Sequence, residues 1–153
     1  MTMRRIEFNV GPITTQCANL ISQPAHMHRR EEKIRAARVW FVSNFKCKTM
    51  AEFGKLCPPG SDTNASFRQF TSYWEMAASF VNSGVLNPEL CFANCREMLL
   101  CWVRVKPLVG EMRQAYGDSS YMAHLEKAGD AYASWLVKNG GADAYDGFVK
   151  RVG

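Results

Sequence analysis

The stretch from Ser66 to Trp102 constrains the fold of this chain more than any other part. Apolar side chains recur in its first half every three to four residues, as they do on one face of an α-helix. This first face comprises Phe67, Phe70, Thr71, Trp74, Ala77, Ala78 and Val81. The second half repeats the pattern with Cys91, Cys95, Met98, Leu99 and Trp102. Because few residues join the halves, we expect an antiparallel pair of helices whose apolar faces bury each other.

The connection between these helices carries specific end signals. Gly84 suits the left-handed conformation that often follows the last helical turn. Asn87 can cap the next helix, Pro88 fits its first position, and Glu89 interacts favourably with the helix dipole. These residues predict that one helix ends near Asn82 and that the next begins at Pro88.

Helical patterns also occupy the flanking segments. A 3.6-residue period runs over residues 25–45, and Thr49 with Glu52 forms a capping box for a short helix that ends before residues 58–60, Pro-Pro-Gly. Pro107 cannot donate its amide, so the helix from Pro88 should end or kink near Val105.

A last long helix completes the pattern. It should start at a cap formed by Asp118 or Ser119 and run to residues 140–141, both glycine. Gly129 lies on the apolar face of this helix and predicts a close crossing with another helix.

These patterns predict an all-α fold. At 153 residues the chain fits one domain. We expect a bundle of about four to five main helices over residues 24–153, preceded by an extended N-terminal arm, residues 1–23, in which Arg5–Val10 could form a short strand.

Basic residues concentrate in the first part of the chain. Residues 1–60 carry ten Lys/Arg and four Asp/Glu, whereas residues 61–153 carry nine and ten. The predicted first helix holds a basic patch of Arg29, Arg30, Lys33, Arg35 and Arg38. Such a patch could meet an acidic protein, an anionic membrane surface or nucleic acid. Glu31 and Glu32 interrupt it, and no nucleic-acid-binding motif accompanies it, so we rank nucleic acid last.

The cysteines indicate the compartment that we expect. No export signal and no run of about 18 apolar residues are visible, so we expect a cytoplasmic protein with reduced thiols and no transmembrane segment. Cys91, Cys95 and Cys101 lack a second ligand pair, and we interpret them as core thiols without metal.

The histidines and glycines likewise lack a recognisable motif. His26, His28 and His124 have no metal-binding spacing, and no Gly-rich phosphate loop occurs, so we expect neither a metal nor a cofactor.

Four charged residues are the candidates for a ligand cleft or a buried ion pair: Arg68, Glu75, Arg96 and Arg104. Glu75 lies two helical turns from Arg68 and follows Trp74 at the edge of the apolar face. We expect Glu75 to pair with Arg96 or Arg104 from the next helix. Such a pair would be either a structural lock or, less readily, part of a catalytic cleft. No nucleophile–base motif supports catalysis, and we name no catalytic residue.

Several of these residues also carry a family resemblance. They are Phe67, Arg68, Phe70, Trp74, Glu75, residues 84–87 (Gly-Val-Leu-Asn), Trp102 and Arg113, with looser agreement at residues 35–38 (Arg-Ala-Ala-Arg), Phe53 and Leu56. Over about residues 30–137 the chain resembles an uncharacterised bacterial family that carries a domain of unknown function. The resemblance implies an all-helical fold and supplies no catalytic residue. Many members of that family begin with a membrane-spanning helix, but no such apolar run is visible in this sequence, so we do not expect one here.

The function that we expect is a helical protein-interaction module, an accessory or adaptor subunit of a larger complex or of a homo-oligomer. The polar N-terminal arm and the surplus of aromatic and Met side chains favour it, because such side chains often anchor interfaces. Two alternatives stay open. One is a small enzyme or ligand-binding protein with a polar cleft near Glu75, Arg96 and Arg104, and the other is a nucleic-acid-binding accessory protein that uses residues 29–38.

Overall fold

The computed structural model describes residues 32–153, and these residues form seven helices and no strand. The helices are α2 (Glu32–Asn44), α3 (Met50–Leu56), α4 (Asp62–Asn82), α5 (Pro88–Asn94), α6 (Arg96–Tyr116), α7 (Ala123–Gly140) and α8 (Ala144–Val152). The predictions for the arm, residues 1–23, and for His26, His28, Arg29 and Arg30 lie outside the described residues.

The all-helical prediction is confirmed, but its count of four to five main helices is wrong for this part of the chain. Two short helices, α3 and α5, account for part of the difference. The chain leaves helical geometry at Cys95, where φ is −113° and ψ is 56°, and this break separates α5 from α6. The tail also forms a helix of its own, α8, whose apolar side chain Phe148 is buried.

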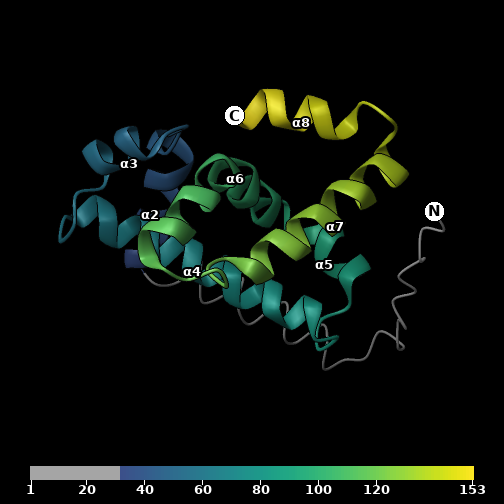
Figure 1. Cartoon of the computed structure of the whole chain (residues 1–153). Coiled ribbons are helices and arrows are strands. Elements are labelled where there is room, and N and C mark those ends of the chain that lie inside the picture. The colour runs from purple at the N-terminus through teal and green to yellow at the C-terminus, as the bar shows by residue number, and fades with distance from the viewer. Residues whose placement is uncertain (1–31) are drawn as a thin grey trace.

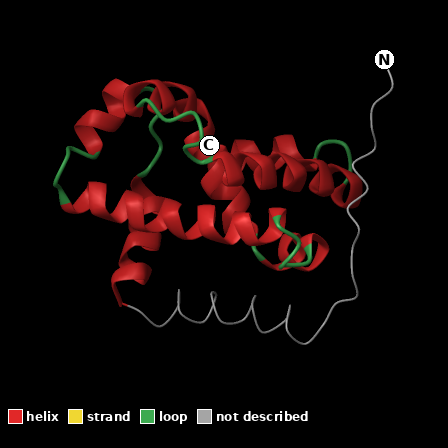
Figure 2. Cartoon of the chain, turned by 60° about the horizontal axis from the view of Figure 1, so that its bottom comes forward, coloured by secondary structure: helices red, strands yellow, loops and turns green. Residues whose placement is uncertain are grey.

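Helix α4 makes the most extensive contacts with other helices (Figure 1). It packs mainly against α2 and α7, while α6 packs against α7 and α8 lies across α6 and α7. Figure 2 shows α2 running obliquely to α4. The predicted hairpin therefore needs correction: α4 does contact α6, and both Trp74 and Trp102 are buried, but α2 and α7 are its main partners. The break at Cys95 redirects the chain and leaves room for α7.

A cluster of stacked, tilted and edge-on aromatic rings joins α2, α3 and α4 at one end of the core. The ring centroids of Phe41 and Phe70 lie 4.3 Å apart, those of Phe45 and Phe67 5.0 Å apart, and those of Phe53 and Phe67 4.9 Å apart. All five side chains are buried. Aromatic pairs at such distances contribute roughly 0.5–1.5 kcal/mol beyond their buried area, so this cluster fixes the three helices together.

Pro107 does not end its helix. Helix α6 continues through Pro107 to Tyr116 and ends at Gly117, whose φ is 62°. A proline in a helix interior costs about 3 kcal/mol. Pro107 is exposed, whereas Val105, Leu108 and Met112 are fully buried, and each buried side chain contributes roughly 1.5–3 kcal/mol. The burial of the helix face outweighs the local penalty.

The close crossing predicted at Gly129 is confirmed. A Cβ atom at this position would overlap the indole ring of Trp102 and lie 2.8 Å from its Cβ. Gly129 thus lets α7 approach α6 directly over Trp102. The indole Nε1 donates to Asp130 Oδ1 at 3.0 Å, which fixes the ring in that position.

The short capping motifs are also confirmed. Thr49 and Glu52 form the capping box of α3, Asn87 caps α5 with Pro88 in its first turn, and Gly84 has a φ of 80°. Among the described residues, no helix is both long enough and apolar enough to cross a membrane.

Candidate functional site

Helix α7 begins later than predicted, and a residue of another helix caps it. Its first residue is Ala123, and Met122 precedes it in the left-handed conformation, with a φ of 56° and no capping side chain. Asp118 does not cap it, because its carboxylate accepts the backbone N–H (2.9 Å) and the hydroxyl (2.6 Å) of Ser120 instead. These bonds lower the pKa of Asp118.

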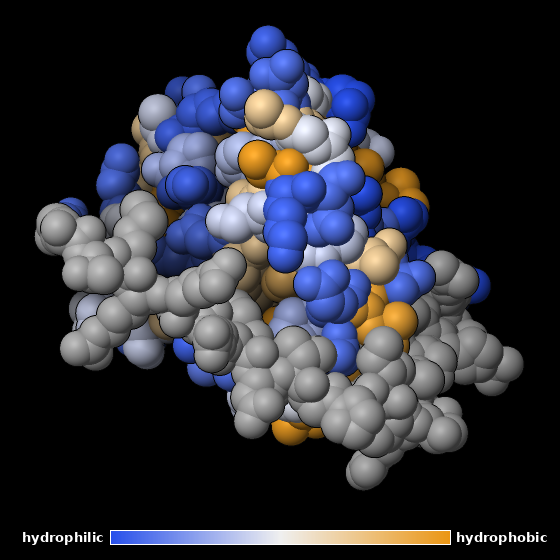
Figure 3. Space-filling model, turned by 90° about the vertical axis from the view of Figure 1, so that its right-hand side faces the viewer, coloured by the Kyte–Doolittle hydropathy of each residue, from blue (hydrophilic) through white to orange (hydrophobic). Residues whose placement is uncertain are grey.

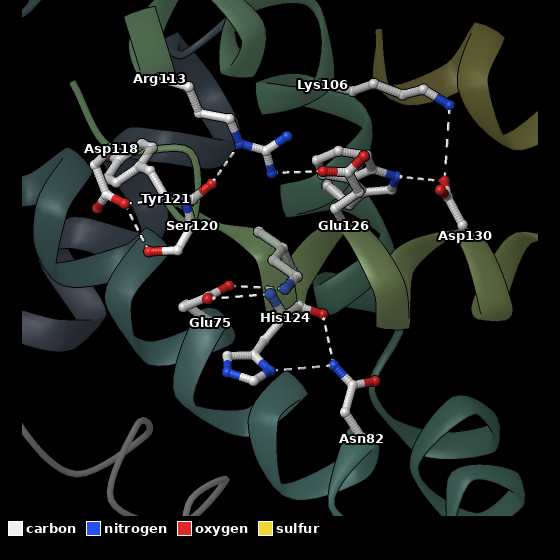
Figure 4. A network of polar contacts seen from close by, with 12 residues as sticks. Glu75, Asn82, Lys106, Arg113, Asp118, Ser120, Tyr121, His124, Glu126 and Asp130 are labelled. Carbon is white, nitrogen blue, oxygen red and sulfur yellow. Dashed lines mark hydrogen bonds and ion pairs between the residues drawn. The ribbon is translucent and has the colours of Figure 1, made fainter. Parts of the chain in front are cut away.

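The cap comes from Glu75 on α4 (Figure 4). Its two carboxylate oxygens accept the backbone N–H groups of His124, at 3.2 Å, and Leu125, at 2.7 Å. Asn82 Nδ2 donates to the carbonyl oxygen of His124 at 3.0 Å, so two residues of α4 bind the same turn of α7. A carboxylate at a helix N-terminus satisfies unpaired amides and interacts with the positive end of the helix dipole. Glu75 thus acts as a structural cap in this arrangement.

Arg113 holds the loop that leads into α7 (Figure 4). Its Nε donates to the carbonyl oxygen of Tyr121 at 2.9 Å, and its guanidinium pairs with Glu126 at 2.5 Å. The half-buried pair links the end of α6 to the first turns of α7.

Arg104 is buried and makes three hydrogen bonds to backbone carbonyl groups. It donates to Phe41 and Val42 at the end of α2 and to Val152 at the end of α8, all at 2.7 Å. Burial lowers the pKa of the Arg104 guanidinium. This side chain joins three helices and supplies donors to carbonyl groups at helix ends, where the intrahelical partners run out. The carbonyl group of Phe41 also accepts the backbone N–H of Phe45.

The predicted ion pair of Glu75 with Arg96 or Arg104 needs correction. Within residues 32–153 Glu75 makes no such pair. Both of its carboxylate oxygens accept backbone N–H groups, and the guanidinium of Arg104 donates to backbone carbonyl oxygens. Arg96 is exposed and lies over the ring of Tyr132, 5.9 Å from its centroid. The expected polar cleft would need all three residues together, and the structure gives each of them a separate role in the fold.

The cysteines mostly pack in the core as predicted. Cys91 and Cys101 are buried, Cys95 is half-buried, and none of the five described cysteines forms a disulfide. Between residues 32 and 153 no three His, Cys, Asp or Glu side chains gather as metal ligands would.

Cys91 and Cys95 interact at the end of α5, where Cys95 is the C-terminal cap. The thiol of Cys91 donates to the sulfur of Cys95, which lowers the pKa of Cys95, although burial and Glu97 oppose this effect. The same contact and burial raise the pKa of Cys91. Cys95 is therefore the thiol of this pair that more readily becomes a thiolate.

Arg68, the remaining candidate, lines a cleft of about 370 Å³ that we call the Arg68 cleft. Four parts of the chain form it, namely α3, the loop before α4, α4 itself, and the segment from the end of α6 to α7. The lining residues are Phe53, Pro59, Gly60, Asn64, Phe67, Arg68, Tyr116 and Tyr121. This volume lies at the lower end of the range for ligand pockets.

The cleft combines an aromatic lining with a single cationic side chain. Phe53 and Phe67 are buried, whereas Tyr116 is 52% exposed and packs edge-on against Tyr121, with ring centroids 5.1 Å apart. Burial raises the pKa of Tyr121 to about 12. Sequence reasoning selected Arg68 but missed both tyrosines, because they lie some fifty residues away and follow no periodic pattern with it.

The basic patch is only partly described. Lys33, Arg35 and Arg38 lie on α2, and all three side chains are exposed. Arg38 forms an ion pair with Glu97 of α6, which reduces the net positive charge of this surface.

Comparison with known proteins places this fold in a family. Residues 11–131 match the family model described as a domain of unknown function, DUF4760. This range includes α2 to α6, the first half of α7 and every residue that lines the Arg68 cleft, but not α8. No curated protein and no solved structure matched the chain. Since the match covers well over half of its residues, the chain belongs to the DUF4760 family.

Proposed function

We propose that this chain is a helical protein-interaction module, an accessory or adaptor subunit of a larger complex or of a homo-oligomer, and that the Arg68 cleft receives a segment of its partner. The cleft itself is the observation that carries the proposal. It offers exposed aromatic surface beside a positive charge, and interface anchors are enriched in Tyr and Arg.

The surface outside the cleft supports this choice of site. The exposed large apolar residues Val39, Met76, Val85, Tyr116 and Val137 belong to different parts of the chain, and Tyr116 is the one that lines the cleft. In Figure 3 apolar residues appear as small patches among hydrophilic ones. A broad apolar face would favour a large permanent interface. Small patches favour recognition of a short segment.

The enzyme alternative receives less support. It depends on Glu75, Arg96 and Arg104 as a catalytic group, and Glu75 and Arg104 have their polar atoms bonded to the backbone. A general acid or base must reach its substrate, which these two side chains could not do without breaking fold contacts. The nucleic-acid alternative also loses support, because Glu97 pairs with Arg38.

We further propose that the module works in a bacterial cytoplasm. The four buried cysteines, Cys47, Cys57, Cys91 and Cys101, are free thiols, and free thiols are typical of a reducing compartment.

Affinity capture with variants of the cleft tests the proposed function. The full-length chain is compared with Arg68→Glu, Tyr116→Ala and, as a matched control, Lys127→Glu on the exposed face of α7, while light scattering reports self-association. We expect the wild type and the control to retain the same partner, or the same oligomer, and both cleft variants to lose it. Retention by the cleft variants would exclude the cleft as the interface. A chain that stays monomeric and captures nothing specific would contradict the interaction function.

A further inference from the structure

Arg68 differs from the other arginines of the described chain in that no hydrogen bond, ion pair or aromatic ring contact engages its side chain. Arg38 and Arg113 form ion pairs, Arg104 binds carbonyl groups, and Arg96 lies over an aromatic ring. Between residues 32 and 153 nothing forms a hydrogen bond or an ion pair with the side chain of Arg68, which is exposed at the cleft. Its guanidinium keeps all five N–H donors available to a ligand.

The surroundings of Arg68 indicate which anion suits it. A guanidinium binds a carboxylate through two parallel hydrogen bonds. Phosphate groups carry more charge, and their sites usually gather several cations or backbone amides, whereas Arg68 is the only charged residue among those that line the cleft. A single carboxylate therefore matches the charge that the cleft offers.

Tyr121 adds a second polar group. Its hydroxyl makes no hydrogen bond within the described residues, and its ring is half-buried at the cleft. Its phenol is protonated at neutral pH, and burial raises its pKa further, to about 12, so the hydroxyl can donate a hydrogen bond. Arg68 and Tyr121 together provide donors beside the buried rings of Phe53 and Phe67.

We propose that the Arg68 cleft recognises a protein segment in which a Glu or Asp side chain lies next to an aromatic or large aliphatic side chain. The carboxylate binds Arg68, and the apolar side chain packs against the exposed ring of Tyr116 and the half-buried ring of Tyr121. A volume of about 370 Å³ is small for a whole helix but admits one or two side chains. This inference rests on the proposed function, because it specifies the chemistry of the partner at the same cleft.

NMR titration of the isotope-labelled full-length chain tests the proposal. The probes are the capped peptides acetyl-Gly-Phe-Glu-Gly-amide and acetyl-Gly-Glu-Phe-Gly-amide, and matched peptides replace Glu by Gln or Phe by Ala. For at least one order of the two residues we expect saturable shifts at the amides of residues 60–68 and 116–121. Replacement of Glu by Gln should raise the Kd about five- to tenfold, as expected for a charged hydrogen bond that stays partly in water.

Variants of the protein assign this difference to the guanidinium. Arg68→Gln should bind the Glu and Gln peptides equally, Arg68→Lys should retain part of the preference, and Lys127→Gln should behave as the wild type. Tyr116→Ala should weaken both peptides by a similar factor. The Arg68→Gln variant and the Glu-to-Gln peptide together form a double-mutant cycle. The preference for Glu that is lost in Arg68→Gln measures the contact between the guanidinium and the carboxylate.

The outcomes separate this inference from the proposed function. Equal binding of the Glu and Gln peptides by the wild type would show that the cleft does not recognise a carboxylate. The proposed interaction function would still stand if Tyr116→Ala weakened the binding of both peptides. The absence of shifts at the cleft would overturn the inference even if affinity capture still depended on Arg68. If free 3-phenylpropionate bound as tightly as the peptides, the occupant would be a small aromatic acid, and the proposal of a protein segment would be wrong.

Discussion

Glu75 on α4 and Leu125 on α7 are joined by a 2.7 Å hydrogen bond from the backbone N–H of Leu125 to the carboxylate of Glu75. Fifty residues separate them in the sequence. The bond holds the start of α7 against α4. The side chain of Met122, which precedes α7, cannot cap the helix in place of Glu75.

We expect Glu75→Ala to destabilise the protein by about 1–2 kcal/mol, as the loss of a helix cap does. Glu75→Gln keeps one oxygen acceptor but loses the charge, so its effect should be smaller, since a charge at a helix end contributes about 0.3–1 kcal/mol. Urea denaturation measures the free energy of unfolding of both variants. Glu111→Gln on the exposed face of α6 is the control. Equal stability of Glu75→Ala and the control would show that the cap contributes nothing.

Gly129 and Gly110 should respond to alanine with opposite signs. Gly129→Ala places a methyl group in the ring of Trp102, and overpacking of this kind costs about 1–3 kcal/mol. Gly110 has nothing within 4 Å of an added Cβ and has ordinary helical geometry, so Gly110→Ala should stabilise α6 by about 0.5–1 kcal/mol. Thermal denaturation of the two variants checks this, and a stabilised Gly129→Ala would mean that α6 and α7 do not cross closely there.

Arg104 should be more important for stability than for any activity. Arg104→Met fills similar space but leaves the carbonyl groups of Val42 and Val152 without the donor that Arg104 supplies, while that of Phe41 keeps only the backbone N–H of Phe45, and we expect a loss of about 2–4 kcal/mol. Hydrogen exchange should become faster in α8 and at the end of α2. The exposed substitution Lys138→Met serves as the control. Unchanged exchange in α8 would contradict the role that we assign to Arg104.

The thiols should differ in reactivity. The pKa of Cys95 is lowered by the Cys91 thiol, so a larger fraction of Cys95 is thiolate at pH 7 than would be without that donor. Burial raises the pKa of Cys57 and Cys101, and the hydrogen bond to Cys95 together with burial raises the pKa of Cys91. With limiting iodoacetamide, peptide mapping should find Cys95 modified first among the five described cysteines.

Two variants test the cause of this reactivity. Cys91→Ala removes the donor and should slow the modification of Cys95 at pH 7, whereas Cys91→Ser keeps a hydroxyl donor and should slow it less. An unchanged rate in Cys91→Ala would show that the contact does not control Cys95.

The sequence alone determined the all-helical class, many helix ends and one crossing. The capping box of Thr49 and Glu52, the start of α5 at Asn87 and Pro88, and the close approach at Gly129 all follow from signals that act within a few residues. Local signals failed where tertiary contacts opposed them. Helix α6 continues through Pro107 because its inner face is buried, and α7 begins at Ala123 because Glu75 supplies a cap that the neighbouring residues lack.

The tertiary structure alone decided what the charged side chains do. Glu75, Arg96 and Arg104 are prominent in the sequence, yet each meets a different partner, and the cleft at Arg68 forms only when the end of α6 and the loop before α7 reach α4. The physical reason is the range of the interactions. Helix propensity and capping by neighbouring residues depend on side chains three or four positions apart. Arg68 and Tyr121, in contrast, come together only after the burial of the apolar faces has set the relative positions of α4, α6 and α7.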